Sequence, residues 1–236
     1  MKTLFHPAAE RGHADHGWLN AHHSFSFAGW YDPSKVHFGM LRVLNDDIVA
    51  GGQGFGMHPH NDMEIITIIL SGALQHRDNM GNGSIIRPGD VQVMSAGTGV
   101  YHSEFNPSET EPTNLFQLWI FPKEKNIAPR YDQQSFAASA RENRIQTVAS
   151  GFRNGNELYI HQDAALSLTK LQAGTTLEYV PAKTGNGAYV MVIHGSATIG
   201  GIAASSRDAV GIWDAASISL SAQADTELLI IDVPMN

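Results

Sequence analysis

The chain has 236 residues, enough for one large domain or for two domains of roughly 100 to 120 residues each. Its composition, 42% hydrophobic and 16% charged, is typical of a folded globular protein and excludes a mainly disordered or fibrous one. The 15 lysines and arginines against 23 acidic residues give a net charge of −8 and form no basic stripe, so we expect no direct contact with nucleic acid.

Two further features restrict the chemistry and the location. The absence of cysteine excludes disulfides, thiolate nucleophiles and Cys-type metal sites, so any metal must be held by nitrogen and oxygen ligands. The N-terminus lacks the apolar core of a signal peptide, and no stretch approaches about 18 consecutive apolar residues. We therefore expect a cytoplasmic protein that does not contact a membrane.

Short apolar runs separated by Gly, Pro, Asn and Asp recur along the whole chain and predict an all-β protein. Residues 87–90, Arg-Pro-Gly-Asp, predict a type II turn. Residues 134–144 have the composition of a short exposed helix. No other window shows a helical pattern, so we expect little helix in the protein. The clearest strand candidates, in chain order, are residues 64–70, 90–94, 115–121, 189–193 and 227–231.

The chain divides into two β-rich halves. Residues 134–144 lie between them and form the candidate connection, so we predict two domains, residues 1–132 and 133–236. Residues 70–74, Leu-Ser-Gly-Ala-Leu, and residues 193–199, Ile-His-Gly-Ser-Ala-Thr-Ile, each interrupt an apolar strand with a glycine turn. This repeated pattern of strand, glycine turn and strand predicts a duplicated β-domain.

Two short motifs in the first half offer metal ligands. His58-Pro-His60 and His102-Ser-Glu104 each place two ligating side chains two residues apart, and such positions on a strand project to one face. With 12 histidines in the chain, each type of pair is expected to occur by chance about 0.5 times per chain, so neither pair is significant alone. The glycines that frame the motifs, from Gly52 to Gly99, make the pattern specific.

The framed motifs resemble the two motifs of cupins, and they are closer still to the pirin family of two-domain cupins. The specific motifs cover roughly residues 10 to 130, with a weaker match towards the C-terminus. The stretches that carry the resemblance are residues 58–64, 70–72, 76–82, 89–92 and 95–104, and, as in the short bacterial members, 18–27, 31–33 and 42–47.

The resemblance implies two tandem cupin barrels, each a double-stranded β-helix or jelly roll, with one metal ion in the N-terminal barrel. Its ligands would be the residues that match His58, His60, His102 and Glu104. Three imidazoles and one carboxylate fit Fe(II), the metal we expect, and are compatible with Ni, Cu, Mn, Co or Zn. Glu64 is the rival carboxylate; we assign ligation to Glu104 and expect Glu64 to orient an imidazole.

The remaining histidines lack such pairs. His161 and His194 are the only ones in the second half, so we predict a C-terminal cupin-like barrel without metal ligands. His76 is expected to be solvated or bonded to backbone. Candidates for a pocket entrance, with simple packing as the alternative, are His22, His23, Trp18, Phe25, Phe27, Trp30 and Tyr31.

An aromatic substrate needs an apolar lining inside the barrel. Alternating strand positions can supply one, but the sequence does not reveal which of the two alternating sets faces inward. The positions considered are Ile66, Ile68, Val91, Val93, Phe116 and Leu118.

Short bacterial pirins resemble quercetin 2,3-dioxygenases, which implies a metal-dependent dioxygenase that opens a flavonol ring with O₂ and releases CO. In this hypothesis Glu104 also takes the hydroxyl proton of the substrate if its own coordination to the metal loosens. The rival is a metal- or redox-sensing regulator, like other family members, which requires a protein partner. A sugar-binding or isomerase cupin is a third hypothesis, and we expect a monomer.

Overall fold

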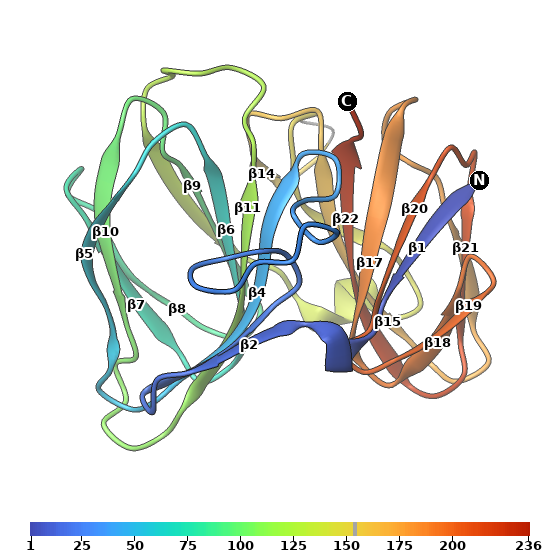
Figure 1. Ribbon diagram of the computed structural model, residues 1–236, viewed down its shortest axis with the longest axis horizontal. Helices are drawn as coiled ribbons and strands as arrows, with labels where there is room; N and C mark the ends of the chain where they lie inside the picture. Colours follow the sequence, from blue (N-terminus) through green and yellow to red (C-terminus); the bar gives the residue numbers. More distant parts are fainter. Residues whose placement is uncertain (153–154) are drawn as a thin grey trace.

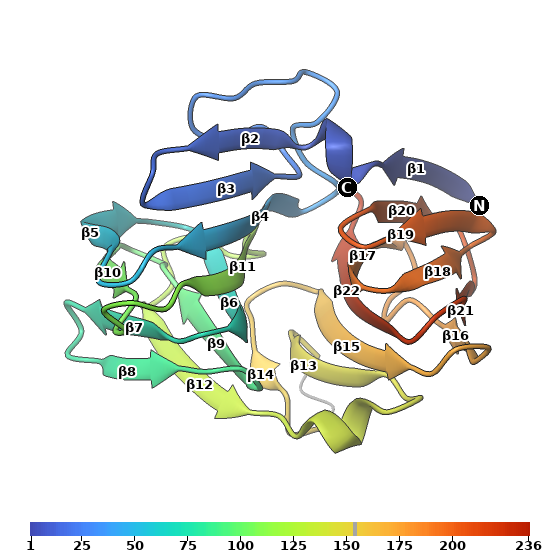
Figure 2. The ribbon, with the colours of Figure 1, turned by 90° about the horizontal axis from the view of Figure 1, so that it is seen from below.

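The computed structural model describes residues 1–152 and 155–236 and consists of two β-barrels side by side (Figures 1 and 2). Each barrel combines a seven-stranded and a four-stranded sheet, so the prediction of two tandem jelly rolls is confirmed. In the described ranges helix is limited to the 3₁₀ helices η1 (Ala8–Glu10) and η2 (Ala138–Arg141), and no helix there is long and apolar enough to span a membrane. The helix expected over residues 134–144 is thus reduced to η2.

The strands of the first barrel come mainly from the first half of the chain. Its seven-stranded sheet has the order β12 (Arg130–Ser135), β9 (Asp90–Ser95), β6 (Glu64–Ser71), β11 (Thr113–Ile120), β4 (Leu41–Val49), β3 (Leu19–His23) and β2 (Gly12–Asp15). Its four-stranded sheet has the order β5 (Gly54–His60), β10 (Val100–Phe105), β7 (Leu74–Asp78) and β8 (Gly83–Ile86).

The second barrel repeats this arrangement except at one edge. Its seven-stranded sheet has the order β1 (Lys2–His6), β20 (Ala209–Trp213), β17 (Asn186–His194), β22 (Thr226–Pro234), β15 (Ala165–Leu171), β13 (Gln146–Ser150) and β14 (Leu158–Tyr159). Its four-stranded sheet has the order β16 (Thr176–Tyr179), β21 (Ile218–Ala222), β18 (Ser196–Ile199) and β19 (Ile202–Ser205). At the differing edge β14 pairs in parallel with β13, whereas β2 is antiparallel to β3.

The first strand of the chain completes the second barrel. β1 pairs with β20, with Lys2 opposite Trp213 and His6 opposite Ala209. It takes the edge position that β12 takes against β9 in the first barrel. The division after residue 132 stays a prediction, but the sheets assign β1 to the second barrel, and β12 extends beyond that boundary to Ser135.

The repeated glycine turn has the same geometry in both barrels. Gly72 and Gly195 have positive φ values of 78° and 88°, which a side chain rarely adopts. A Cβ atom would also lie 2.6 Å from the Oγ1 of Thr113 and 2.7 Å from that of Thr226, respectively. Each threonine hydroxyl donates to the carbonyl of the residue after the glycine, at 2.7 and 2.8 Å. The duplication is therefore visible in packing and hydrogen bonding.

The two large sheets pack against each other in one shared core. Alternate residues of β6, β9 and β11 meet alternate residues of β15, β17 and β22. The inner face of the first barrel is formed by the opposite set, which includes Ile65, Ile69 and Met94. The residues considered above as a barrel lining face the second barrel instead: Ile66, Ile68, Val91, Val93, Phe116 and Leu118.

Candidate metal centre

The predicted ligands lie on two paired strands of the first barrel. β5 and β10 are antiparallel, with His58 opposite His102. On β10 the buried positions include His102 and Glu104, whereas Ser103 between them is only half-buried. This alternation points both motif residues into the barrel, as a strand period of two requires.

Three imidazoles converge inside the barrel. The ligating nitrogens of His58, His60 and His102 lie within 4.8 Å of one another, and the ring centroids are 4.4 to 4.9 Å apart. Glu104 belongs to a second such group, with His102 and His76. The two groups share His102, so the four predicted ligands lie in one cluster. The structure places His76 next to this cluster.

His76 was missed by the sequence analysis, which expected a solvated side chain. It is fully buried, stacks on Tyr131 with ring centroids 4.6 Å apart, and holds its Nε2 3.2 Å from the Oδ2 of Asp78. Its Nδ1 lies 3.5 Å from the Nδ1 of His102. The sequence signal was the His76-x-Asp78 spacing, which places both residues on one face of β7.

These contacts indicate which ring nitrogen of His102 and of His58 is left free. If His76 donates from Nε2 to Asp78, its Nδ1 accepts from His102, and the His102 Nε2 lone pair is free. The His58 Nδ1 lies 2.8 Å from the carbonyl oxygen of Gly56, so that its Nε2 is free as well. Such outer hydrogen bonds typically set the tautomer of a metal-binding histidine.

Two buried atoms at the centre lack partners. The Nε2 of His102 and the Oε1 of Glu104 have no hydrogen bond to any residue that the structure describes. The other oxygen of Glu104 accepts from Gln117 Nε2 at 2.8 Å, and Gln117 in turn accepts from Trp119 Nε1 at 3.2 Å. Unpartnered buried polar atoms are rare, and these donor atoms fit a divalent transition metal.

Burial controls the protonation of the cluster. It lowers the pKa of His60 to about 4 and that of His102 to about 2, with neighbouring imidazoles adding to the effect. Both rings are therefore neutral at pH 7, which is the form that binds metal. Burial also raises the pKa of Glu104, and a bound cation would favour its ionised form.

A cavity of about 250 Å³ opens beside the cluster. Of the residues expected at a pocket entrance, His23 and Phe27 line it, whereas Phe25 lies in the inter-barrel core and Tyr31 is exposed. Most of the wall is apolar, and its complete lining is Leu19, Ala21, His23, Phe27, Asn45, Asp47, Phe55, His58, His60, Glu104, Gln117 and Trp119.

Glu64 contacts the second barrel instead of an imidazole. It is buried, and its Oε2 accepts hydrogen bonds from Ser95 Oγ at 2.8 Å and from the backbone N–H of His161 at 3.1 Å. Ile65, the next residue of β6, packs inside the first barrel, so Glu64 must point outward. Burial raises the pKa of Glu64 to about 7. The expectation that this carboxylate orients an imidazole is therefore wrong.

Family models match both barrels. The model described as Pirin matches residues 5–120, and the model described as Quercetinase C-terminal cupin domain matches residues 147–233. The chain is 45% identical over 228 residues to the quercetin 2,3-dioxygenase of Escherichia coli strain K12, covering 96% of each chain. It is 44% identical to a pirin-like protein of Caulobacter vibrioides, covering 96% of this chain and 97% of the relative.

Solved structures agree with this assignment. The crystal structure of YhhW from Escherichia coli matches with a TM-score of 0.95 and 44% identity, covering 99% of this chain and 98% of YhhW. The structure of the bacterial pirin YhhW in complex with nickel(II) matches with a TM-score of 0.93 and 43% identity over 99% of both chains. The chain thus belongs to the pirin family.

Proposed function

We propose that the first barrel binds one divalent metal ion through His58, His60, His102 and Glu104. The observation that carries this proposal is the pair of buried, unpartnered atoms, His102 Nε2 and Glu104 Oε1, beside the converging imidazoles. The nickel(II) complex of the related bacterial pirin supports a divalent metal. Fe(II) is the metal we expect here, and the same donor set is compatible with nickel.

We further propose that the protein is a dioxygenase that opens the ring of a flavonol-like substrate with O₂ and releases CO. Several relatives are named quercetin 2,3-dioxygenase, some of them as putative enzymes. The cavity beside the cluster suits a flat aromatic molecule, because Phe27, Phe55 and Trp119 provide apolar walls around the carboxylate of Glu104.

When bound, the metal would polarise the substrate oxygen and lower the pKa of its hydroxyl group. The walls of the cavity exclude water and hold the aromatic rings. When Glu104 is not coordinated, its Oε1 takes the hydroxyl proton, while Gln117 keeps the other carboxylate oxygen in place through its 2.8 Å hydrogen bond.

An oxygen-electrode assay tests the proposal. The protein is reconstituted anaerobically with Fe(II) or Ni(II), and O₂ uptake and CO release are then recorded with quercetin. We expect metal-dependent turnover that His60→Ala abolishes and that Tyr179→Phe, a change in the second barrel, preserves. A fully metallated protein that consumes no O₂ with any flavonol would refute the dioxygenase and would favour the regulatory hypothesis with a protein partner.

A further inference from the structure

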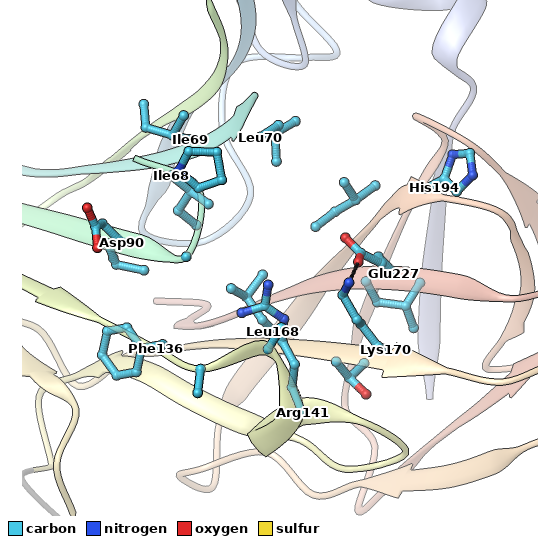
Figure 3. Close-up of a pocket in the computed structure, with 18 of the residues that line it drawn as sticks. Ile68, Ile69, Leu70, Asp90, Phe136, Arg141, Leu168, Lys170, His194 and Glu227 are labelled. Carbon is cyan, nitrogen blue, oxygen red and sulfur yellow. Dashed lines mark ion pairs between the residues drawn. The ribbon is translucent and has the colours of Figure 1, made fainter. Parts of the chain in front are cut away.

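A cavity of about 780 Å³ lies between the two barrels and contains none of the proposed metal ligands. Ile68 and Leu70 of β6 line it on one side, and Leu168 of β15 and Leu228 of β22 line it on the other. Phe136 and the η2 segment close one end (Figure 3). The volume falls in the range of sites for small organic ligands, and the wall combines apolar side chains with a nearly equal share of polar surface.

One cation in this cavity has no counter-charge. Arg141 lines the cavity, and Figure 3 shows its guanidinium beside Leu168, pointing between the barrels. Its Nη1 is buried without a hydrogen bond, and the arginine makes no ion pair with any residue in the described ranges. The residue as a whole is half-buried.

The other charged groups of the cavity are already paired. Lys170 Nζ lies 2.5 Å from Glu227 Oε1, the ion pair drawn in Figure 3. Arg207 Nε lies 2.9 Å from the Oδ2 of Asp46. Asp90 accepts hydrogen bonds from the backbone N–H of Arg87 and from the side chains of Gln133 and Ser135. Among the charged side chains that line the described cavity, Arg141 is therefore the one with an unpartnered buried nitrogen, and His194 adds an imidazole to the same lining.

We propose that this inter-barrel cavity binds an amphipathic carboxylate, with the carboxylate on Arg141 and the apolar body between Ile68, Leu70 and Leu168. A guanidinium presents its N–H groups as a rigid fork that matches a carboxylate. A single unpaired arginine balances one negative charge, which favours a monocarboxylate over a dianionic phosphate ester. The site does not depend on the reaction proposed for the first barrel.

Calorimetric titration of the metal-loaded protein with 2-naphthoate tests this site. We expect saturable binding that Arg141→Gln weakens roughly tenfold to a hundredfold, the usual value of a hydrogen bond to a charged group. Arg144→Gln is the matched control, because Arg144 lies on the same segment, is exposed and does not line the cavity. The neutral isostere 2-naphthamide should bind at least about tenfold more weakly than naphthoate.

Two further variants identify where naphthoate binds. His60→Ala changes the metal cavity and should leave the naphthoate affinity unchanged, whereas Leu168→Trp should fill the inter-barrel cavity and abolish binding. The proposal fails if wild type shows no saturable binding, if Arg141→Gln binds as tightly as wild type, or if His60→Ala alone removes binding. Tighter binding of 1-naphthyl phosphate than of naphthoate would overturn the assignment to carboxylates.

Discussion

The two barrels share a strand order but differ in what fills them. The interior of the second barrel is one apolar cluster. The apolar interior of the first is split into two smaller clusters, and buried polar side chains are found on the same strands. The second barrel also buries polar side chains, among them Asn186 and Asp232, but the first barrel has the more divided apolar interior.

Strand register identifies the exchanged positions in the large sheets. Thr67 lies five residues before Gly72 and pairs with Gln92 and Gln117. Val190 lies five residues before Gly195 and pairs with Val210 and Ile230. A layer of three polar side chains in the first barrel thus corresponds to a layer of three aliphatic side chains in the second, listed pairwise as Thr67 with Val190, Gln92 with Val210 and Gln117 with Ile230.

The small sheets show the same exchange at the proposed ligands. His102 lies opposite His58 in the first barrel, and Ile218 lies opposite Tyr179 in the second. Glu104 lies opposite His76, and Leu220 lies opposite Ile199. Tyr179 directs its hydroxyl to Asp232 Oδ2 at 2.7 Å. Tyr179 thus provides a matched control position for changes at His58.

The largest effect is expected from removing a ligand. His58→Ala should abolish stoichiometric metal binding, because it removes one of three converging imidazoles, whereas Tyr179→Phe at the corresponding position should leave metal content unchanged. Elemental analysis of the purified variants and circular dichroism, which reports folding, check this. Full metal content in a folded His58→Ala protein would contradict the site.

The two buried glutamates should behave differently. Glu104→Gln removes a ligating carboxylate and should cause loss of most of the metal, whereas Glu64→Gln, on the outer face of β6, should retain it. Metal titration of both variants in parallel measures the difference. Equal loss from the two variants would show that the outward position of Glu64 does not isolate it from the metal.

Glu64 should also make stability depend on pH. Its folded-state pKa of about 7 lies above the ordinary value of 4.5, so its contribution is fully present below pH 4.5 and is lost as pH rises through 7. We therefore expect Glu64→Gln to exceed wild type by about 3 kcal/mol in unfolding free energy at pH 8 and to match it near pH 4.5. Urea unfolding at the two pH values measures this, and an equal difference at both would refute it.

His76 should affect the metal without ligating it. His76→Phe keeps an aromatic ring against Tyr131 but removes the acceptor for His102, so metal affinity should fall roughly tenfold to a hundredfold. Competition with a chelator measures the affinity, and His37→Phe, at an exposed histidine, is the control. Complete loss of metal would instead make His76 a ligand.

The smallest effect is expected from making the first barrel more like the second. Both amide atoms of Gln92 are buried without partners among the described residues, and Val210 occupies the corresponding position. Gln92→Met should raise the unfolding free energy of the metal-free protein by about 1 kcal/mol. Urea denaturation checks this, and a destabilised variant would show that the amide has a structural role.

Local patterns predicted the strands, the glycine turns and the His-x-His and His-x-Glu motifs, because each depends on neighbours a few residues apart. Which face of a central strand turns inward was not predictable. The strand 64–71 is buried on both faces and carries apolar residues on both, which removes the alternation that reveals orientation. For the same reason Glu64 was assigned to the wrong face.

The pairing of strands that are distant in sequence was not predicted either. Nothing local in Lys2–His6 indicates that this strand pairs with β20, about 200 residues later. His76 was missed because its partners, His102 and Tyr131, are distant in sequence. Its spacing from Asp78 was the one local signal, and that signal is weak by itself.

The most direct test of the central claim is anomalous diffraction from a crystal of the metal-reconstituted protein, recorded at the absorption edge of the metal. We expect one strong peak per chain, within coordination distance of His58 Nε2, His60, His102 Nε2 and Glu104 Oε1. A peak bonded to His76, a peak in the second barrel or the absence of any peak in the first barrel would contradict the account.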